Sequence, residues 1–98
     1  MLRLLLVAPN ENPVEVQIPH TLEALQALVE GYIEAVKLGD YILVCNEEGL
    51  LKGLPFNRNI GGYHIVGTCF ITKGDDYGEF VSLTDEDIAD IKRKWFNY

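Results

Sequence analysis

Two apolar stretches separated by a polar turn open the chain. Residues 2–8 are apolar at every position except Arg3, which is typical of a strand buried on both faces. Residues 9–13 are dense in proline and asparagine, and Val14–Ile18 then alternates apolar and polar positions as a half-buried strand does. This pattern predicts a β-hairpin.

Helical spacing of apolar residues replaces the alternation after Pro19. Residues Leu22, Leu25, Leu28 and Val29 recur on one face of a helix. Thr21 is placed to cap the N-terminus of this helix, and Gly31 supplies the signal that ends it.

The middle of the chain predicts further strands. Residues 32–38 and Tyr41–Asn46 are joined by Gly39-Asp40, and glycine at the first central position favours a tight type II′ hairpin. Residues 41–45 are apolar throughout, so this strand is expected at the centre of a sheet. A turn over residues 46–49 and a short strand over residues 50–54 are expected next.

An irregular stretch is expected over residues 55–62, followed by one long strand over residues 64–73. Gly67 within that strand indicates a bulge or a close backbone approach. A turn then leads to a strand over residues 79–83, and Thr84 caps a last helix with Ile88, Ile91 and Trp95 on its inner face. The order β-β-α-β-β-β-β-β-α predicts an α+β fold, with two helices on a mainly antiparallel sheet of about six to seven strands.

Composition narrows the class of protein. The 98 residues, 48% of them hydrophobic, suit a single domain over residues 1–98. Eight basic and fifteen acidic residues give a net charge of −7, which disfavours direct binding to nucleic acid or to an anionic membrane. Neither a targeting segment nor a membrane span is evident in the sequence, so a cytoplasmic location is expected.

Cys45 and Cys69 each lie within an apolar run, and their spacing matches no zinc or redox motif. We expect two reduced thiols packed as small hydrophobes, a disulfide only if their strands are neighbours, and no metal ion or cofactor. A Cys45–His64 nucleophile is a weak alternative, since no oxyanion donor or orienting acid is evident. A general acid–base pair of Glu47 and Glu48 is also weak, because adjacent side chains in a turn usually diverge.

Acidic residues are unevenly distributed along the chain. Residues 50–74 contain no acid but hold Lys52, Arg58 and Lys73, whereas residues 75–90 contain seven acids and no base. Arginine presents a planar fork of donors suited to phosphate or carboxylate, and adjacent glycines expose backbone N–H groups. The acid-free segment is therefore a candidate site for a small anionic ligand. The alternative is that Arg58 pairs with Glu47 or Glu48 and that the glycines only shape a turn.

A nucleotide-like ligand is the chemistry that this segment suits best. Arg58 and Lys52 would hold phosphate, Tyr63 would stack on a base, and the asparagines would bond to ribose or base. Glu47 would orient Arg58 or accept from a ribose hydroxyl. The candidate ligand-binding residues are Asn46, Glu47, Lys52, Asn57, Arg58, Gly61 and Tyr63.

Residues 46–58 contain an Asn-Glu-Glu-Gly turn followed by Leu-Pro-x-Asn-Arg. Together with residues 18–26, 65–71 and 78–85, this segment resembles a small family described only as a domain of unknown function, found in phages, plasmids and other mobile elements of bacteria. The resemblance implies a cytoplasmic accessory protein of such an element, and importance for Asn46, Glu47, Asn57 and Arg58. It implies no activity. Cys69 stands where a larger hydrophobe is expected, which argues against a catalytic thiol there.

Two functions from different classes follow from these patterns together with the mobile-element origin that the resemblance implies. The first is a non-enzymatic counter-defence sponge, a homodimer or higher homo-oligomer, that sequesters a nucleotide-derived signalling molecule. The second is an acidic inhibitor that mimics DNA or blocks a host factor through residues 75–90. A nucleotide hydrolase that uses Glu47 and Glu48 is the weakest alternative.

Overall fold

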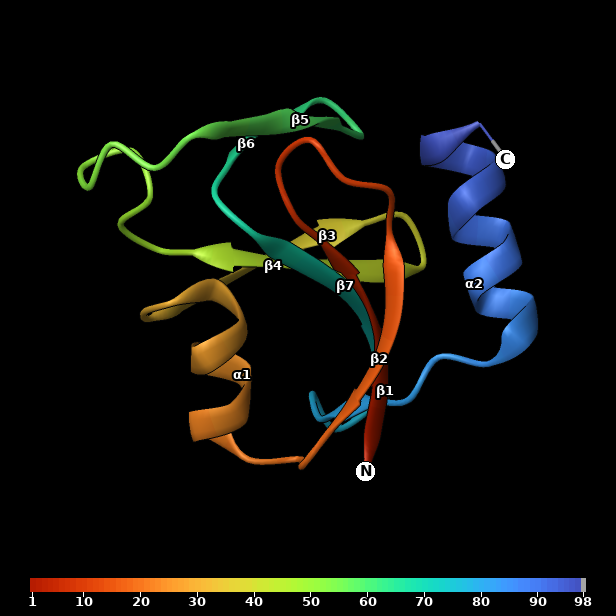
Figure 1. The fold of residues 1–98 in the computed structure, drawn as a ribbon. Coiled ribbons are helices and arrows are strands. Elements are labelled where there is room, and N and C mark those ends of the chain that lie inside the picture. The colour runs from red at the N-terminus through yellow and green to blue at the C-terminus, as the bar shows by residue number, and fades with distance from the viewer. Residues whose placement is uncertain (98) are drawn as a thin grey trace.

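The computed structural model describes residues 1–97. Its elements are β1 (Leu2–Val7), β2 (Val14–Ile18), α1 (Leu22–Val29), β3 (Ile33–Leu38), β4 (Tyr41–Asn46), β5 (Phe56–Ile60), β6 (Tyr63–Val66), β7 (Cys69–Gly74), β8 (Phe80–Val81), α2 (Asp85–Ile91) and the π-helical turn η1 (Lys92–Phe96). The main sheet has the strand order β2-β1-β7-β4-β3, with β8 paired to β7. The strands β5 and β6 form a second, two-stranded sheet (Figure 1).

Antiparallel pairing joins every strand to its neighbours in both sheets, which confirms the α+β class. The first hairpin pairs Leu2 with Ile18, and the second pairs Leu38 with Tyr41 across the expected two-residue turn. Gly39 has a φ of +59° and Asp40 has no positive φ, as a type II′ turn requires. The apolar strand β4 lies between β7 and β3, as its composition predicts.

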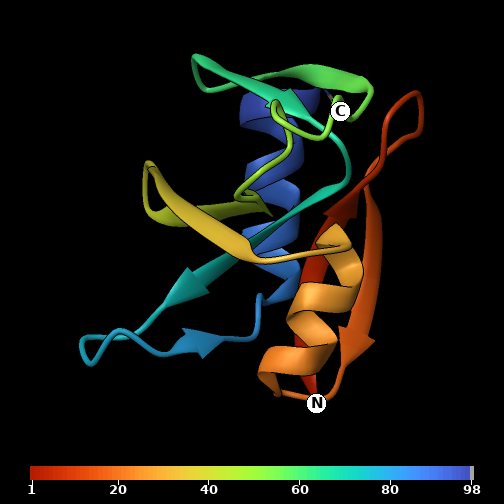
Figure 2. The same cartoon turned by 90° about the vertical axis from the view of Figure 1, so that its left-hand side faces the viewer.

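Each face of the main sheet carries its own helix (Figures 1 and 2). On one face, Leu25 and Val29 of α1 pack with Leu4, Val44 and Phe70. On the other face, α2 and the small sheet enclose a second cluster that contains Leu43, Ile60, Ile65, Ile71 and Ile91. The two clusters arise because alternate residues of each strand point to opposite faces.

The helix termini follow local signals in the sequence. Thr21 accepts a hydrogen bond from the Ala24 N–H, and Thr84 forms a capping box with Asp87. The left-handed residue that ends α1 is Glu30, with a φ of +60°, rather than the expected Gly31. A Cβ on Gly31 would lie 2.6 Å from Asn46 Nδ2, so this glycine is required by a close approach.

The region between β4 and β7 differs from the expectation. Residues 50–53 form turns and Leu54 is irregular, so no short strand is present there, and Phe56–Ile60 is the strand β5 instead of an irregular stretch. A shift of register between Phe56 and Arg58 interrupts the alternation that would have indicated β5 in the sequence. These two differences cancel in number, and the eighth strand, where the sequence pattern predicts seven, comes from the division of the next expected strand.

The long strand expected over residues 64–73 is two strands that belong to different sheets. The chain bends at Gly67, which has a φ of +74° and donates its N–H to the Pro55 carbonyl at 2.7 Å. A Cβ at this position would lie 2.7 Å from Leu54 Cδ1, so the expected close approach is confirmed. This bend carries β6 away from the main sheet and over its α2 face.

Candidate functional site

Asn46 lies at the end of β4 and is buried. Its Nδ2 donates to the Val29 carbonyl at 3.0 Å, and its Oδ1 accepts from the Glu48 N–H at 2.8 Å. The side chain thereby satisfies the last turn of α1 and shapes the turn after β4. Both polar ends of this carboxamide are used inside the protein.

Asn57 is buried on β5, and its carboxamide connects three segments. Nδ2 donates to the carbonyls of Val7 at 2.9 Å and Gly67 at 2.8 Å. Oδ1 accepts from Arg58 Nε at 2.8 Å. This side chain holds the small sheet to β1 and to the bend before β7.

Arg58 contacts backbone rather than Glu47 or Glu48. Its Nη2 donates to the carbonyls of Ala8 at 3.1 Å and Glu11 at 2.5 Å, both in the loop between β1 and β2. Its guanidinium carbon lies 5.6 Å from the ring centroid of Phe96, within cation–π range. The guanidinium of Arg58 therefore donates hydrogen bonds to the β1–β2 loop and packs against the C-terminal turn.

The two lysines of the acid-free segment also have partners. Lys52 Nζ lies 3.8 Å from Glu48 Oε1, and Lys73 Nζ lies 2.6 Å from Asp87 Oδ2. Every cation that the sequence offers for phosphate in residues 50–74 is thus neutralised or hydrogen-bonded within the fold.

The remaining candidates lie at the tip of the small sheet and on the turn after β4. Gly61 and Gly62 form the β5–β6 turn with φ of +55° and +88°, and Gly61 is close to Leu38. The Tyr63 hydroxyl donates to the Lys37 carbonyl at 3.0 Å. Glu47 is exposed. The seven candidates therefore fall into three places: the end of β4 with the turn after it, the part of β5 that contacts the β1–β2 loop, and the tip of the small sheet.

A hollow of about 380 Å³ lies between β3, β4 and β6, and we call it the β3–β6 hollow. Its lining includes the carboxylates of Glu34 and Glu47, which are exposed and form no ion pair within residues 1–97. Leu50 and Leu51 on the neighbouring turn also line it and are 75% and 89% exposed. The β3–β6 hollow is thus an apolar surface with two free carboxylates.

Cys45 and His64 both line the β3–β6 hollow, as a Cys–His nucleophile would require. Burial and the nearby Glu34 raise the pKa of the Cys45 thiol, so it stays protonated at neutral pH. The His64 ring stacks on Phe56 with centroids 4.7 Å apart. Cys69 is fully buried, and burial raises its pKa to about 12. Both cysteines are free thiols, and neither supplies a thiolate at neutral pH.

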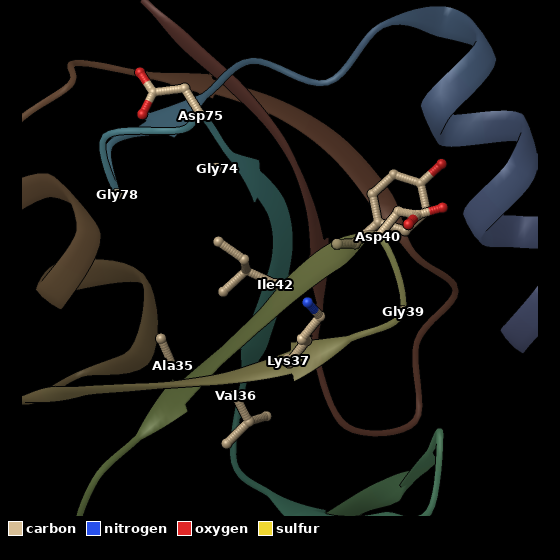
Figure 3. A pocket seen from close by; sticks show the side chains of 10 residues that line it. Ala35, Val36, Lys37, Gly39, Asp40, Ile42, Gly74, Asp75 and Gly78 are labelled. Atoms are coloured by element: carbon tan, nitrogen blue, oxygen red, sulfur yellow. The ribbon is translucent and has the colours of Figure 1, made fainter.

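A second hollow of about 490 Å³ lies on the α1 face of the main sheet, between the β3–β4 hairpin and the β7–β8 turn, and we call it the α1-side hollow. Figure 3 shows the side chains of Ala35, Lys37 and Ile42 on β3 and β4, with the β7–β8 turn across from them. Lys37 is exposed and forms no ion pair within residues 1–97. Lys37 is not among the candidates selected from the sequence, although a cation within a largely apolar strand is a signal that could have identified it.

Four of the seven acidic residues in the run after β7 form ion pairs or hydrogen bonds within the fold. Asp85 pairs with Arg3, Asp87 with Lys73, and Asp90 with Arg93 and Lys94. Asp75 accepts the N–H groups of two residues in its own turn. Asp76, Glu79 and Glu86 remain exposed and without ion pairs in the described part of the chain. The acids of this run therefore serve mainly to hold the C-terminal helix in place through ion pairs.

A cluster of metal ligands and a membrane-spanning helix are both absent from residues 1–97. Among residues 1–97, no three His, Cys, Asp or Glu side chains are arranged to hold a metal ion. The helices in the same range are all too short or too polar to cross a membrane. No curated protein and no solved structure matches the chain. A family model matches residues 2–96, almost the whole length, and the chain therefore belongs to the family described as domain of unknown function DUF3846.

Proposed function

We propose that this protein is a non-enzymatic accessory protein of a phage or other mobile element, and that it acts in the host cytoplasm by binding a basic host protein. The observation that carries the proposal is the β3–β6 hollow, where the unpaired Glu34 and Glu47 stand beside exposed leucines. An apolar surface edged by free carboxylates complements a partner that offers apolar side chains among lysines and arginines.

The net charge of −7 supports the same class of partner. A field of this sign speeds the encounter with a basic protein and repels nucleic acid. Four of the seven acids of residues 75–90 have internal partners, so a mimic of DNA built only on that run would have three free carboxylates within residues 1–97. The β3–β6 hollow offers the free charge together with apolar area, which a protein interface needs.

Affinity capture with a matched pair of variants tests this function. The variant Glu34→Gln/Glu47→Gln removes the two carboxylates with little change of shape, and Asp76→Asn/Glu86→Gln removes two exposed acids elsewhere. We expect a lysine- and arginine-rich host protein to be retained by the wild type and the control variant. The same protein should be lost from the first variant and from the wild type at high salt. Equal capture by all three proteins would contradict the proposal.

Sequestration of a nucleotide-derived signal is the second candidate, and Lys37 is the observation that favours it. This ammonium lines the α1-side hollow next to the apolar floor of Ala35 and Ile42, where a base could lie. Asp40 and Asp75 line the same hollow and would repel a phosphate, so this candidate comes second.

Mass spectrometry separates the two candidates. The protein is purified from cells whose nucleotide-based immune signalling has been triggered, and it is then denatured. An intact nucleotide released in stoichiometric amount would support the sponge. A protein that releases nothing would leave protein binding as the function. Light scattering on the purified protein before denaturation tests the expected homodimer.

A further inference from the structure

We propose that an extended segment of the partner protein adds to the outer edge of β3 and places a lysine or arginine side chain in the β3–β6 hollow. This inference rests on the proposed binding of a basic protein and specifies how that protein is recognised. It joins two features of the fold that lie side by side: an unpaired sheet edge and a hollow with free carboxylates.

The strand β3 ends the main sheet and pairs only with β4 within residues 1–97. Leu38 and Tyr41 flank the two-residue turn and form the first hydrogen-bonded pair of this hairpin. Bonded and non-bonded pairs alternate along an antiparallel ladder, so the N–H and C=O groups of Ile33, Ala35 and Lys37 point away from β4.

Two hydrogen bonds agree with this alternation. The Glu47 N–H donates to the Tyr32 carbonyl at 2.8 Å, which continues the inward set of bonds by one pair. The Tyr63 hydroxyl donates to the Lys37 carbonyl at 3.0 Å, which shows that this carbonyl points outward. Tyr63 closes one end of the edge, and no other segment of residues 1–97 pairs with the outward backbone groups of Ile33 and Ala35. Figure 2 shows the β3–β4 hairpin extending from the body of the molecule.

Register decides where a side chain of the added strand would lie. Glu34 pairs with Cys45, and both line the β3–β6 hollow, so this pair faces β6. A partner residue opposite Glu34 points to the same face. Its aliphatic stem would pack against the exposed Leu50 and Leu51, and a cationic head would reach the carboxylates of Glu34 and Glu47. Lysine and arginine have this combination of stem and head.

Charge favours a basic partner over a second copy of this chain. Two copies that pair antiparallel through the backbone groups of Ile33 and Ala35 set Glu34 directly opposite Glu34 of the symmetry mate, on the same face. Like charges at that distance repel, and each copy adds a net charge of −7. A partner segment with a central lysine or arginine would instead be attracted by the carboxylate of Glu34.

A labelled strand peptide tests the inference on the full chain. The probe has about seven residues, an ordinary strand length, with alternating valine and threonine around a central lysine. We expect the amide resonances of Ile33 and Ala35 to shift on titration, and Glu34→Gln to weaken binding about two- to fivefold, as for an exposed ion pair. A peptide with central glutamate should bind more weakly than one with lysine.

Backbone variants test the addition of a strand directly. Ala35→Pro removes an outward N–H without removing a bond to β4, and proline is tolerated on edge strands. We expect Ala35→Pro to weaken peptide binding about tenfold and Ala35→Val to retain it, because only proline removes the donor. A peptide N-methylated beside its lysine tests the same bonds on the wild-type protein.

Several results would overturn the inference: no shift at Ile33 and Ala35 with millimolar peptide, equal binding of the glutamate peptide, or full binding by Ala35→Pro and by the N-methylated peptide.

The proposed function can fail independently of this inference. If capture of a host protein needs Glu34 and Glu47 but survives Ala35→Pro, protein binding stands and strand addition does not. If the peptide binds the edge and no host protein is captured, strand addition stands alone.

Discussion

The Asn57 carboxamide donates to the Val7 carbonyl at 2.9 Å and so joins β5 to β1 across 50 residues of sequence. A second bond from the same nitrogen reaches Gly67 at 2.8 Å, where the chain turns from the small sheet to the main one. One buried side chain therefore connects the small sheet with the centre of the fold. Asn57 is the asparagine of the Leu-Pro-x-Asn-Arg motif, and these two hydrogen bonds give it a structural role.

We expect Asn57→Ala to lower the free energy of unfolding by roughly 2–3 kcal/mol, because two buried carbonyls lose their donor. Urea unfolding followed by circular dichroism measures the change. The exposed Asn59 on the same strand gives the control, and Asn59→Ala should change stability by less than about 0.5 kcal/mol. Equal effects of the two substitutions would contradict the role assigned to Asn57.

Arg58→Ala should also destabilise the protein. The guanidinium bonds to the carbonyls of Ala8 and Glu11 and lies over Phe96, so its loss frees the β1–β2 loop and the C-terminal turn. A cost of about 1–2 kcal/mol would lower Tm by roughly 5–10 °C in a domain of this size. Arg58→Lys should recover only part of the loss, since an ammonium lacks the planar fork. An unchanged Tm with loss of nucleotide binding would instead support a ligand role for Arg58.

The two thiols should react slowly at neutral pH. Burial raises the pKa of Cys69 to about 12, and burial with the nearby Glu34 raises that of Cys45. Alkylation by iodoacetamide should therefore label the half-buried Cys45 slowly, faster as pH rises, and Cys69 only on unfolding. Mass spectrometry of the Cys45→Ala variant gives the control. Rapid labelling of the wild type at pH 7 would reveal a thiolate and revive the Cys–His alternative.

Acid should destabilise the C-terminal helix through Asp87. Burial alone would raise the pKa of this carboxyl, but its hydrogen bonds with Lys73 and Thr84 outweigh burial and hold the pKa below the ordinary 3.8. A carboxyl with a lowered pKa in the folded state stabilises the protein above its unfolded pKa, and this contribution disappears as pH falls through the folded pKa. Stability should thus fall below about pH 4.

Asp87→Asn isolates this contribution, because asparagine keeps the shape and loses the charge that faces Lys73. We expect a loss of about 1 kcal/mol at pH 7 and a flatter dependence of stability on pH below 4. Glu86→Gln, at an exposed position of the same turn, should leave both measurements unchanged. An identical pH dependence of Asp87→Asn and the wild type would exclude Asp87 as the titrating group.

Local signals in the sequence determined most elements of this protein. The caps at Thr21 and Thr84, the Gly39-Asp40 turn and the alternation in Val14–Ile18 all act over a few residues, and the structure confirms each of them. The apolar β4 lies inside the main sheet because a strand without a polar face must be covered on both sides.

Only the tertiary structure decided the partners of polar side chains. The sequence identifies Asn57 and Arg58 as a donor pair suited to a ligand, but their acceptors are carbonyls of Val7, Ala8 and Glu11, on a distant part of the chain. The bend at Gly67 carries β6 over the α2 face, and His64, Ile65 and Val66 thereby reach the hollow that Glu34, Glu47, Leu50 and Leu51 also line. Such contacts depend on how elements pack, and residue types along the chain do not encode them locally.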